Sequence, residues 1–298
     1  MYALTVGGAA VLVIVMCLVA YELVDNASLA ISRLGPGFVF GSSWTETSLD
    51  ASRVSFGALP FIYGTLLTSV FALLWAGVLG VSIGIFLSLL APKPVARVIG
   101  PLVEMLAAIP SVVIGLIGIV LIEPLSTDVL QPAFHRVLGF IPLFGEPQST
   151  GSLFTASIVL TIMILPIVSA LTRDVFLTVP QDLRDGAEAL GATRWEMIRG
   201  IVLPTTVSGI VGACVLAFGR AIGEAIAVTQ VIGGSTVIHA SMFASGTAIG
   251  PAIANEFESP VSLLHESALY YLAVILLAIG VLTNVLSRWV VRRGTRLA

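Results

Sequence analysis

The sequence predicts an all-α membrane protein with six transmembrane helices, and three observations support this fold class. Hydrophobic residues make up 57% of the 298 residues, charged residues make up only 10%, and the mean hydropathy is +1.06. Six apolar runs approach or exceed the roughly 20 residues that a helix needs to cross about 30 Å of hydrocarbon. This composition excludes a water-soluble domain. The six runs cover residues 3–21, 62–91, 100–122, 152–172, 205–231 and 267–287.

The first run is interpreted as a membrane anchor that remains in the mature chain. It has no basic segment before it, and it is longer than the apolar part of a signal peptide. We expect residues 1–55 to form this transmembrane helix and an outward loop, and residues 56–298 to form the main transmembrane domain.

The distribution of basic residues predicts the orientation of the chain. Six spans place the connecting segments alternately on two sides, and cytoplasmic segments carry an excess of Lys and Arg. Both termini are therefore predicted to be cytoplasmic, and segments 22–61, 123–151 and 232–266 are predicted to face outward. The outward side holds only Arg33, Arg53 and Arg136. The other side holds Lys93, Arg97, Arg173, Arg184, Arg194, Arg199, Arg288, Arg292, Arg293 and Arg296.

The outward segment 232–266 is long for a loop, and glycines and Pro251 interrupt its apolar stretches. Such a segment either dips into the protein or folds over the outer mouth as a lid. The sequence leaves both alternatives open.

A polar segment of about residues 180–203 lies between the fourth and fifth runs, on the side predicted to be cytoplasmic. Its first part is predicted to be a short helix, because Leu183, Ala187 and Leu190 recur at the spacing of one helix face. Gly191 is expected to end that helix.

A second short helix is predicted directly after Gly191. Thr193, followed three residues later by Glu196, has the spacing of a capping box, which starts a helix. Trp195 gives this helix an apolar side chain among its charges, and Leu203-Pro204 is expected to open the next span. Two helices meeting at a glycine would form a knuckle that projects from the membrane.

The stretch "DGAEALGATRWEMIRGIVLP", residues 185–204, resembles the coupling loop of ABC importer permeases, which has the pattern E-A-A-x3-G-x9-I-x-L-P. The chain departs from the pattern by Asp for Glu and by Gly for Ala, and the glycine costs about 1 kcal/mol of helix propensity. The resemblance implies that the loop docks on a separate ATPase subunit, whereas composition alone also fits an ordinary connector at the membrane surface. The residues predicted to take part are Asp185, Gly186, Ala187, Gly191, Arg194, Trp195, Ile201, Leu203 and Pro204.

Four further segments resemble phosphate-specific ABC permeases of the PstC type. They are "FGALPFIYGTLLTSVFALL" at 56–74, "PLVEMLAAIPSVVIGLIGI" at 101–119, "GRAIGEAIAVTQVIG" at 219–233 and "AIANEF" at 252–257. The resemblance implies the type I importer permease fold, also called MetI-like. It also implies four kinds of partner: a second permease of the PstA type, an ATPase dimer of the PstB type, an external phosphate-binding protein of the PstS type, and phosphate itself.

The chain has no phosphate-binding loop of its own. A Walker A loop requires G-x4-G-K-[ST], but the single lysine, Lys93, lies between two prolines. We therefore expect no cofactor in this chain, ATP and Mg²⁺ on a partner ATPase, and no enzymatic activity in the chain itself. The three histidines, His135, His239 and His265, lack metal-ligand spacing, so we also expect no metal, and nothing in the sequence suggests nucleic acid.

Three ionisable residues fall inside the predicted spans, where charge is costly and usually functional. Arg220 and Glu224 lie four residues apart, so they can pair on one helix face and leave the guanidinium for an arriving phosphate. Glu104 precedes Pro110 in the third run and is expected to pair with Arg220 or to bond a backbone group that Pro110 frees. Purely structural roles remain the alternative for all three residues.

The sequence thus predicts the permease subunit of an ATP-driven phosphate importer in the cell (plasma or inner) membrane. Two other functions stay open: a permease for sulfate, molybdate or tungstate, and a proton-coupled secondary transporter that uses a membrane carboxylate. The absence of visible repeated halves weighs against the secondary transporter.

Overall fold

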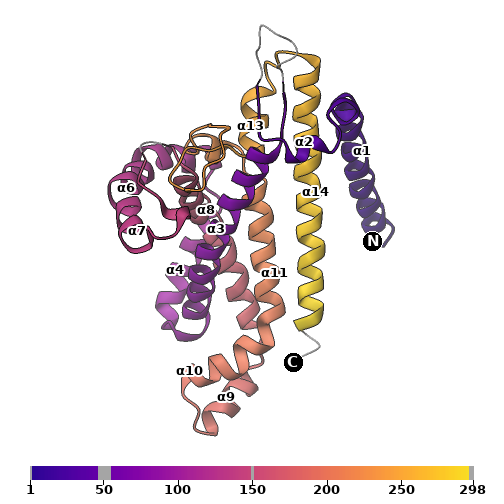
Figure 1. Ribbon diagram of the computed structural model, residues 1–298. Coiled ribbons are helices and arrows are strands. Elements are labelled where there is room, and N and C mark those ends of the chain that lie inside the picture. The colour runs from indigo at the N-terminus through magenta and orange to yellow at the C-terminus, as the bar shows by residue number, and fades with distance from the viewer. Residues whose placement is uncertain (1, 46–54, 149–150, 295–298) are drawn as a thin grey trace.

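The computed structural model describes residues 2–45, 55–148 and 151–294 and consists of helices and their connections (Figure 1). Residues 46–54 of the predicted outward loop and the last four residues lie outside this description. The helices are α1 Tyr2–Leu34, α2 Gly37–Phe40, α3 Leu59–Ile85, α4 Lys93–Leu106, α5 Ser111–Ile117, α6 Glu123–Leu125, α7 Gln131–Leu138, α8 Leu153–Leu177, α9 Gln181–Ala189, α10 Arg194–Met197, α11 Leu203–Ile222, α12 Ile226–Thr229, α13 Ile249–Glu256 and α14 Leu263–Gly294.

Six helical stretches among the described residues are long and apolar enough to cross a membrane, which confirms the predicted fold class and number of spans. Short π-helical turns join neighbouring α-helices within several of them. The chain is a multi-pass membrane protein. The six stretches are Thr5–Leu34, Leu59–Leu90, Ser111–Leu138, Leu153–Leu177, Arg194–Ile222 and Leu263–Ser287.

The predicted boundaries are wrong at three spans. The first helix continues to Leu34, so part of the predicted outward loop is helical. The third run is split, because α4 ends at Leu106 and the apolar stretch starts anew at Ser111, after Pro110. The fifth helix ends at Ile222, because Gly223 leaves helical geometry behind it. Glycine and proline break helices even where the apolar composition continues.

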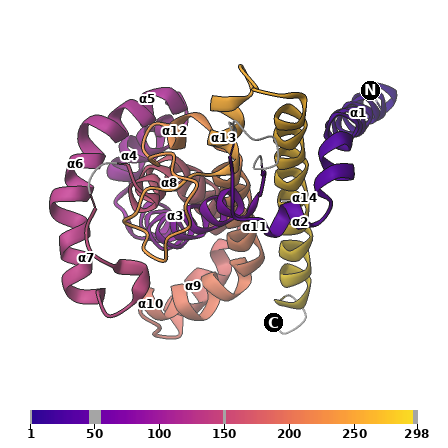
Figure 2. The same cartoon turned by 45° about the horizontal axis from the view of Figure 1, so that its top comes forward.

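The core of the bundle is α8, whose apolar window is 67% buried, the largest share among the six candidate spans. It lies at the centre when the molecule is tilted (Figure 2) and packs mainly on α3. Gly80 of α3 makes this packing close, because a Cβ atom there would lie 2.8 Å from the Val168 side chain. In contrast, α1 lies apart from the rest and packs on α14 (Figures 1 and 2).

The segment between α12 and α13 dips into the protein, which settles the alternative that the sequence left open. Met242 and Phe243 are fully buried. The Met242 N–H donates to the Leu143 carbonyl, and the Phe154 N–H donates to the Met242 carbonyl. The segment therefore covers the start of α8 as part of the core.

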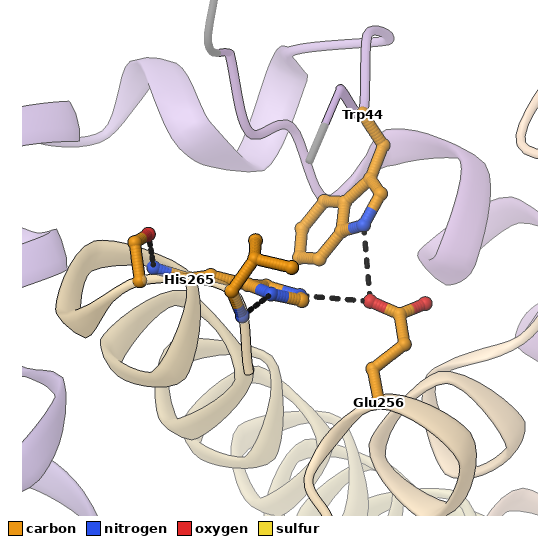
Figure 3. Close-up of polar contacts among 5 residues, drawn as sticks. Trp44, Glu256 and His265 are labelled. Carbon is orange, nitrogen blue, oxygen red and sulfur yellow. Dashed lines mark hydrogen bonds and ion pairs between the residues drawn. The ribbon is translucent and has the colours of Figure 1, made fainter. Parts of the chain in front are cut away.

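A polar cluster joins the segment before α3 to α13 and α14 (Figure 3). The Trp44 indole N–H lies 3.1 Å from Glu256 Oε2, and His265 Nε2 lies 2.9 Å from the same oxygen. The His265 ring is 1% exposed and stacks on Phe56. It is a packing histidine, and its carboxylate partner lies on a neighbouring helix.

Candidate functional site

The knuckle between α8 and α11 has the predicted form, with α9 and α10 projecting from one end of the bundle (Figure 1). Gly191 follows α9 at φ +90°, a conformation that residues with a Cβ atom rarely adopt. The Ala192 N–H bonds the Ala187 carbonyl, and the Gly191 N–H bonds the Glu188 carbonyl. These two bonds form a Schellman motif, so the glycine both ends α9 and sets the angle to α10.

The predicted capping box is present at the start of α10. The Glu196 N–H donates to Thr193 Oγ1 at 3.3 Å, and the Thr193 N–H donates to Glu196 Oε2 at 2.8 Å. A π-helical turn, Ile198–Val202, then joins α10 to α11 without a break. Pro204 is the second residue of α11 and directly follows this π-helical turn. The knuckle helix and the fifth span are therefore one continuous helix, not two helices as the sequence predicted.

The apolar face of α9 differs from the prediction. Ala187 is buried against the cluster that includes Met197 and Val202, but Leu183 is 49% exposed and Leu190 is 92% exposed. Only one residue of the predicted face thus packs inward.

The exposed residues of the knuckle form an open surface that suits docking to another protein. Trp195 is 60% exposed, and Asp185, Gly186, Gly191 and Arg194 are also exposed. The motif residues Ile201 and Leu203 are half-buried and Pro204 is exposed at the junction with α11. Apolar side chains among charges are typical of the residues that anchor protein interfaces.

Arg220 and Glu224 form the predicted ion pair, with Arg220 Nη1 2.9 Å from Glu224 Oε2. The second carboxylate oxygen, Oε1, accepts the Ala227 N–H at 3.1 Å, which fixes the carboxylate to the start of α12. The Glu224 side chain is 3% exposed, whereas Arg220 is 46% exposed. Glu224 is therefore the rigid, buried member of the pair, and Arg220 presents its remaining N–H groups to the outside of the lone chain.

The pair spans the end of α11, whereas the sequence predicted one helix that continues through both residues. Arg220 is in the last turn of α11, where the partial negative charge of the helix end favours a cation. Gly219 and Gly223 line a groove together with Ala273 and Gly280, which lie near the middle of the α14 span. The ion pair thus lies near mid-depth of the membrane although its helix stops there.

Glu104 does not have the partner that the sequence predicted. It lies on α4, outside the stretch Ser111–Leu138, and its Oε1 is 2.7 Å from Nη1 of Arg173 on α8. Among the described residues the carboxylate is therefore held by Arg173, and not by Arg220 or by a backbone group near Pro110. Pro110 directly precedes α5, which is a separate helix from α4. From the sequence, Arg173 is only one of the basic residues on the side predicted to be cytoplasmic.

Comparisons with known proteins show the family of this chain. Residues 80–296 match the family described as "Binding-protein-dependent transport system inner membrane component". The phosphate transport system permease protein PstC of Mesorhizobium japonicum is 41% identical over 97% of this chain and 88% of that protein. The PstC protein of Pasteurella multocida is 40% identical over 94% and 87%. This chain belongs to that permease family, in its PstC branch.

Solved structures support the fold of this PstC-branch permease. A bacterial ABC transporter for alginate, in complex with a periplasmic protein bound to an alginate pentasaccharide, contains a chain that matches with a TM-score of 0.61. That match covers 97% of this chain and 95% of the other at 17% identity. The MetNI methionine ABC transporter matches with a TM-score of 0.57 over 78% and 93%. The predicted MetI-like importer permease fold is confirmed.

Proposed function

We propose that this chain is the permease subunit of an ATP-driven importer of inorganic phosphate in the cell membrane. The observation that carries the proposal is the Arg220–Glu224 pair at mid-depth. A planar guanidinium binds phosphate oxygens in pairs and stays charged at physiological pH. The similarity to PstC proteins supports phosphate as the anion.

In this mechanism the ion pair keeps the empty pathway neutral, and phosphate competes with Glu224 for Arg220. Burial and the Ala227 N–H hold Glu224 in place, so the half-exposed arginine is the group that can change partner. A charge that can exchange partners costs less in the membrane than one that is left alone.

The partners in this proposal are a second permease of the PstA type, two ATPase subunits of the PstB type and an external binding protein of the PstS type. The ATPase, with its ATP and Mg²⁺, would dock on the knuckle through Trp195, Leu183 and Leu190, which the lone chain leaves exposed. The side that carries the knuckle would then be cytoplasmic, as the distribution of basic residues indicates.

Uptake of labelled phosphate tests the proposal directly. Cells that lack this gene should regain uptake when the chain is restored together with its partner subunits. An excess of unlabelled phosphate should abolish the signal, whereas sulfate and molybdate should not. Failure to restore uptake, or equal competition by sulfate, would reject phosphate as the substrate.

A further inference from the structure

A second arginine–carboxylate pair lies in the inner half of the bundle. Arg173 Nη1 on α8 is 2.7 Å from Glu104 Oε1 on α4, and the two side chains are 24% and 51% exposed. Among the described residues, Glu104 is the only hydrogen-bond partner of this guanidinium. Like Arg220, Arg173 therefore has N–H groups left for a further ligand.

Gly100 of α4 lies directly against this guanidinium. A Cβ atom on Gly100 would lie 2.8 Å from Arg173 Nη1, so the guanidinium lies close against the backbone of α4. The guanidinium thus lies between α4 and α8.

The same face of α4 carries two more cations. Lys93, Arg97, Gly100 and Glu104 follow at spacings of four, three and four residues, which places them along one side of the helix. Lys93 and Arg97 are exposed. In Figure 1, α4 lies in the half of the bundle nearer to α9 and α10. Together with Arg173, these residues form a column of positive charge toward the knuckle side.

This column lies further inward along the bundle than the Arg220 site. Val175 of α8 packs against Gly209 of α11, so these two residues lie at the same depth. Each helical residue adds about 1.5 Å along the axis. Arg220 is 11 residues from Gly209 on α11 and therefore lies about 16 Å outward of this depth. Arg173 is two residues from Val175 on α8 and lies about 3 Å outward of it. The two arginines are therefore about 13 Å apart in depth.

One continuous piece of structure connects the two pairs. Glu224 is bound to the start of α12, and α12 packs on α5, where Gly115 lies against Ala227. Helix α5 follows α4 across the short break after Leu106. The two ion pairs are thus connected through α12, α5 and the short break between α5 and α4.

We propose that Arg173 is a second binding station for inorganic phosphate, and that Arg97 and Lys93 continue this anion route toward the cytoplasm. The inference rests on the proposed function and deepens it. An anion that leaves one guanidinium inside a membrane needs another cation nearby, and pores for anions use several weak sites of Arg and Lys. Glu104 would be the resting counterion of Arg173, as Glu224 is of Arg220.

Three variants separate an anion site from a structural bridge. Arg173→Gln should lower phosphate uptake about tenfold, the size expected for one charged hydrogen bond. Glu104→Gln keeps the guanidinium and should retain several-fold more uptake than Arg173→Gln. The exchange Arg173→Glu with Glu104→Arg should stay as low as Arg173→Gln, because the cation is then on the other helix. Equal losses in both single variants, with recovery in the exchange, would show a structural bridge and overturn the proposal.

An exposed residue of the column gives a test that does not depend on the fold of the Arg173 variants. Arg97→Glu should lower uptake several-fold at matched membrane levels. The matched control is Arg136→Glu, which reverses the charge of an exposed arginine at the opposite end of the bundle and should leave uptake unchanged. Normal uptake by Arg97→Glu and Arg173→Gln would also overturn the proposal.

Anionic lipid headgroups carry the same phosphate chemistry, so uptake should also be measured in reconstituted vesicles of phosphatidylcholine alone. The loss in Arg173→Gln should persist there; a loss seen only with anionic lipid would assign the arginine to the headgroups and overturn the proposal. Failure of the proposed function is distinct from these outcomes, because the unaltered chain would then transport no phosphate at all.

Discussion

Arg220→Gln provides the most direct test of the mid-membrane site. The change removes the positive charge and keeps most of the side-chain length. It also leaves the Glu224 carboxylate 97% buried, as its 3% exposure implies, and still bonded to the Ala227 N–H. The site would then present a negative charge to an incoming anion.

The size of the effect follows from the contacts. A hydrogen bond to a charged group contributes about 1.5–3 kcal/mol, and the uncompensated carboxylate adds repulsion in a medium of low dielectric constant. Taking about 3 kcal/mol for the lost attraction alone, phosphate uptake should fall about 100-fold. Arg220→Lys keeps the charge but loses the planar fork, so it should retain weak uptake.

The assay is initial uptake of labelled phosphate at matched membrane levels, with assembly checked by co-purification of the partner subunits. Glu224→Gln is the companion variant, because its amide oxygen can still accept the Ala227 N–H. It should lose less uptake than Arg220→Gln. Near-normal uptake by Arg220→Gln would refute the reasoning and leave the pair as a packing contact.

Three other predictions follow from single positions. Gly191→Val should abolish transport and co-purification with the ATPase while the chain still inserts, because valine is strained at φ +90°. Cysteine at Glu258 should react with a membrane-impermeant thiol reagent from outside, whereas cysteine at Arg194 should react only after the membrane is opened. Gly250→Ala should lower uptake, because its Cβ atom would lie 2.7 Å from the Glu224 carbonyl oxygen and displace the carboxylate.

Each of these tests has a matched control or a contradicting result. Gly186→Ala should leave ATPase binding intact, and Gly280→Ala should leave uptake intact, because nothing lies within 4 Å of a Cβ atom at either glycine. Loss of function in both controls would mean that any glycine substitution is harmful, which contradicts the specific roles. Labelling of the Arg194 cysteine in sealed cells would contradict the six-span topology.

Local features were predictable from the sequence because their partners are close along the chain. The capping box at Thr193, the helix end at Gly191 and the Arg220–Glu224 pair all depend on residues three to five positions apart. Their chemistry and spacing are therefore visible in one stretch of sequence.

Contacts between distant segments were not predictable in this way. Arg173 and Glu104 are 69 residues apart, and Trp44 and Glu256 are 212 apart. No spacing rule connects such residues, and the apolar run that contains Glu104 hid the break before Ser111. The prediction for Glu104 failed because it assumed one unbroken helix, whereas Pro110 separates two.

The continuous helix from Arg194 to Ile222 has a mechanical consequence. Its 29 residues correspond to a rod of about 43 Å, with the knuckle at one end and Arg220 at the other. A rod that pivots at its middle by about 10° moves each end by about 4 Å, in opposite directions. That displacement exceeds the 2.9 Å between Arg220 and Glu224, whose carboxylate accepts the Ala227 N–H of α12 while its backbone N–H bonds the Ala221 carbonyl at the end of the rod. A tilt imposed at the knuckle end is therefore transmitted to the ion pair, where the end of the rod meets α12, without any helix unwinding within the rod.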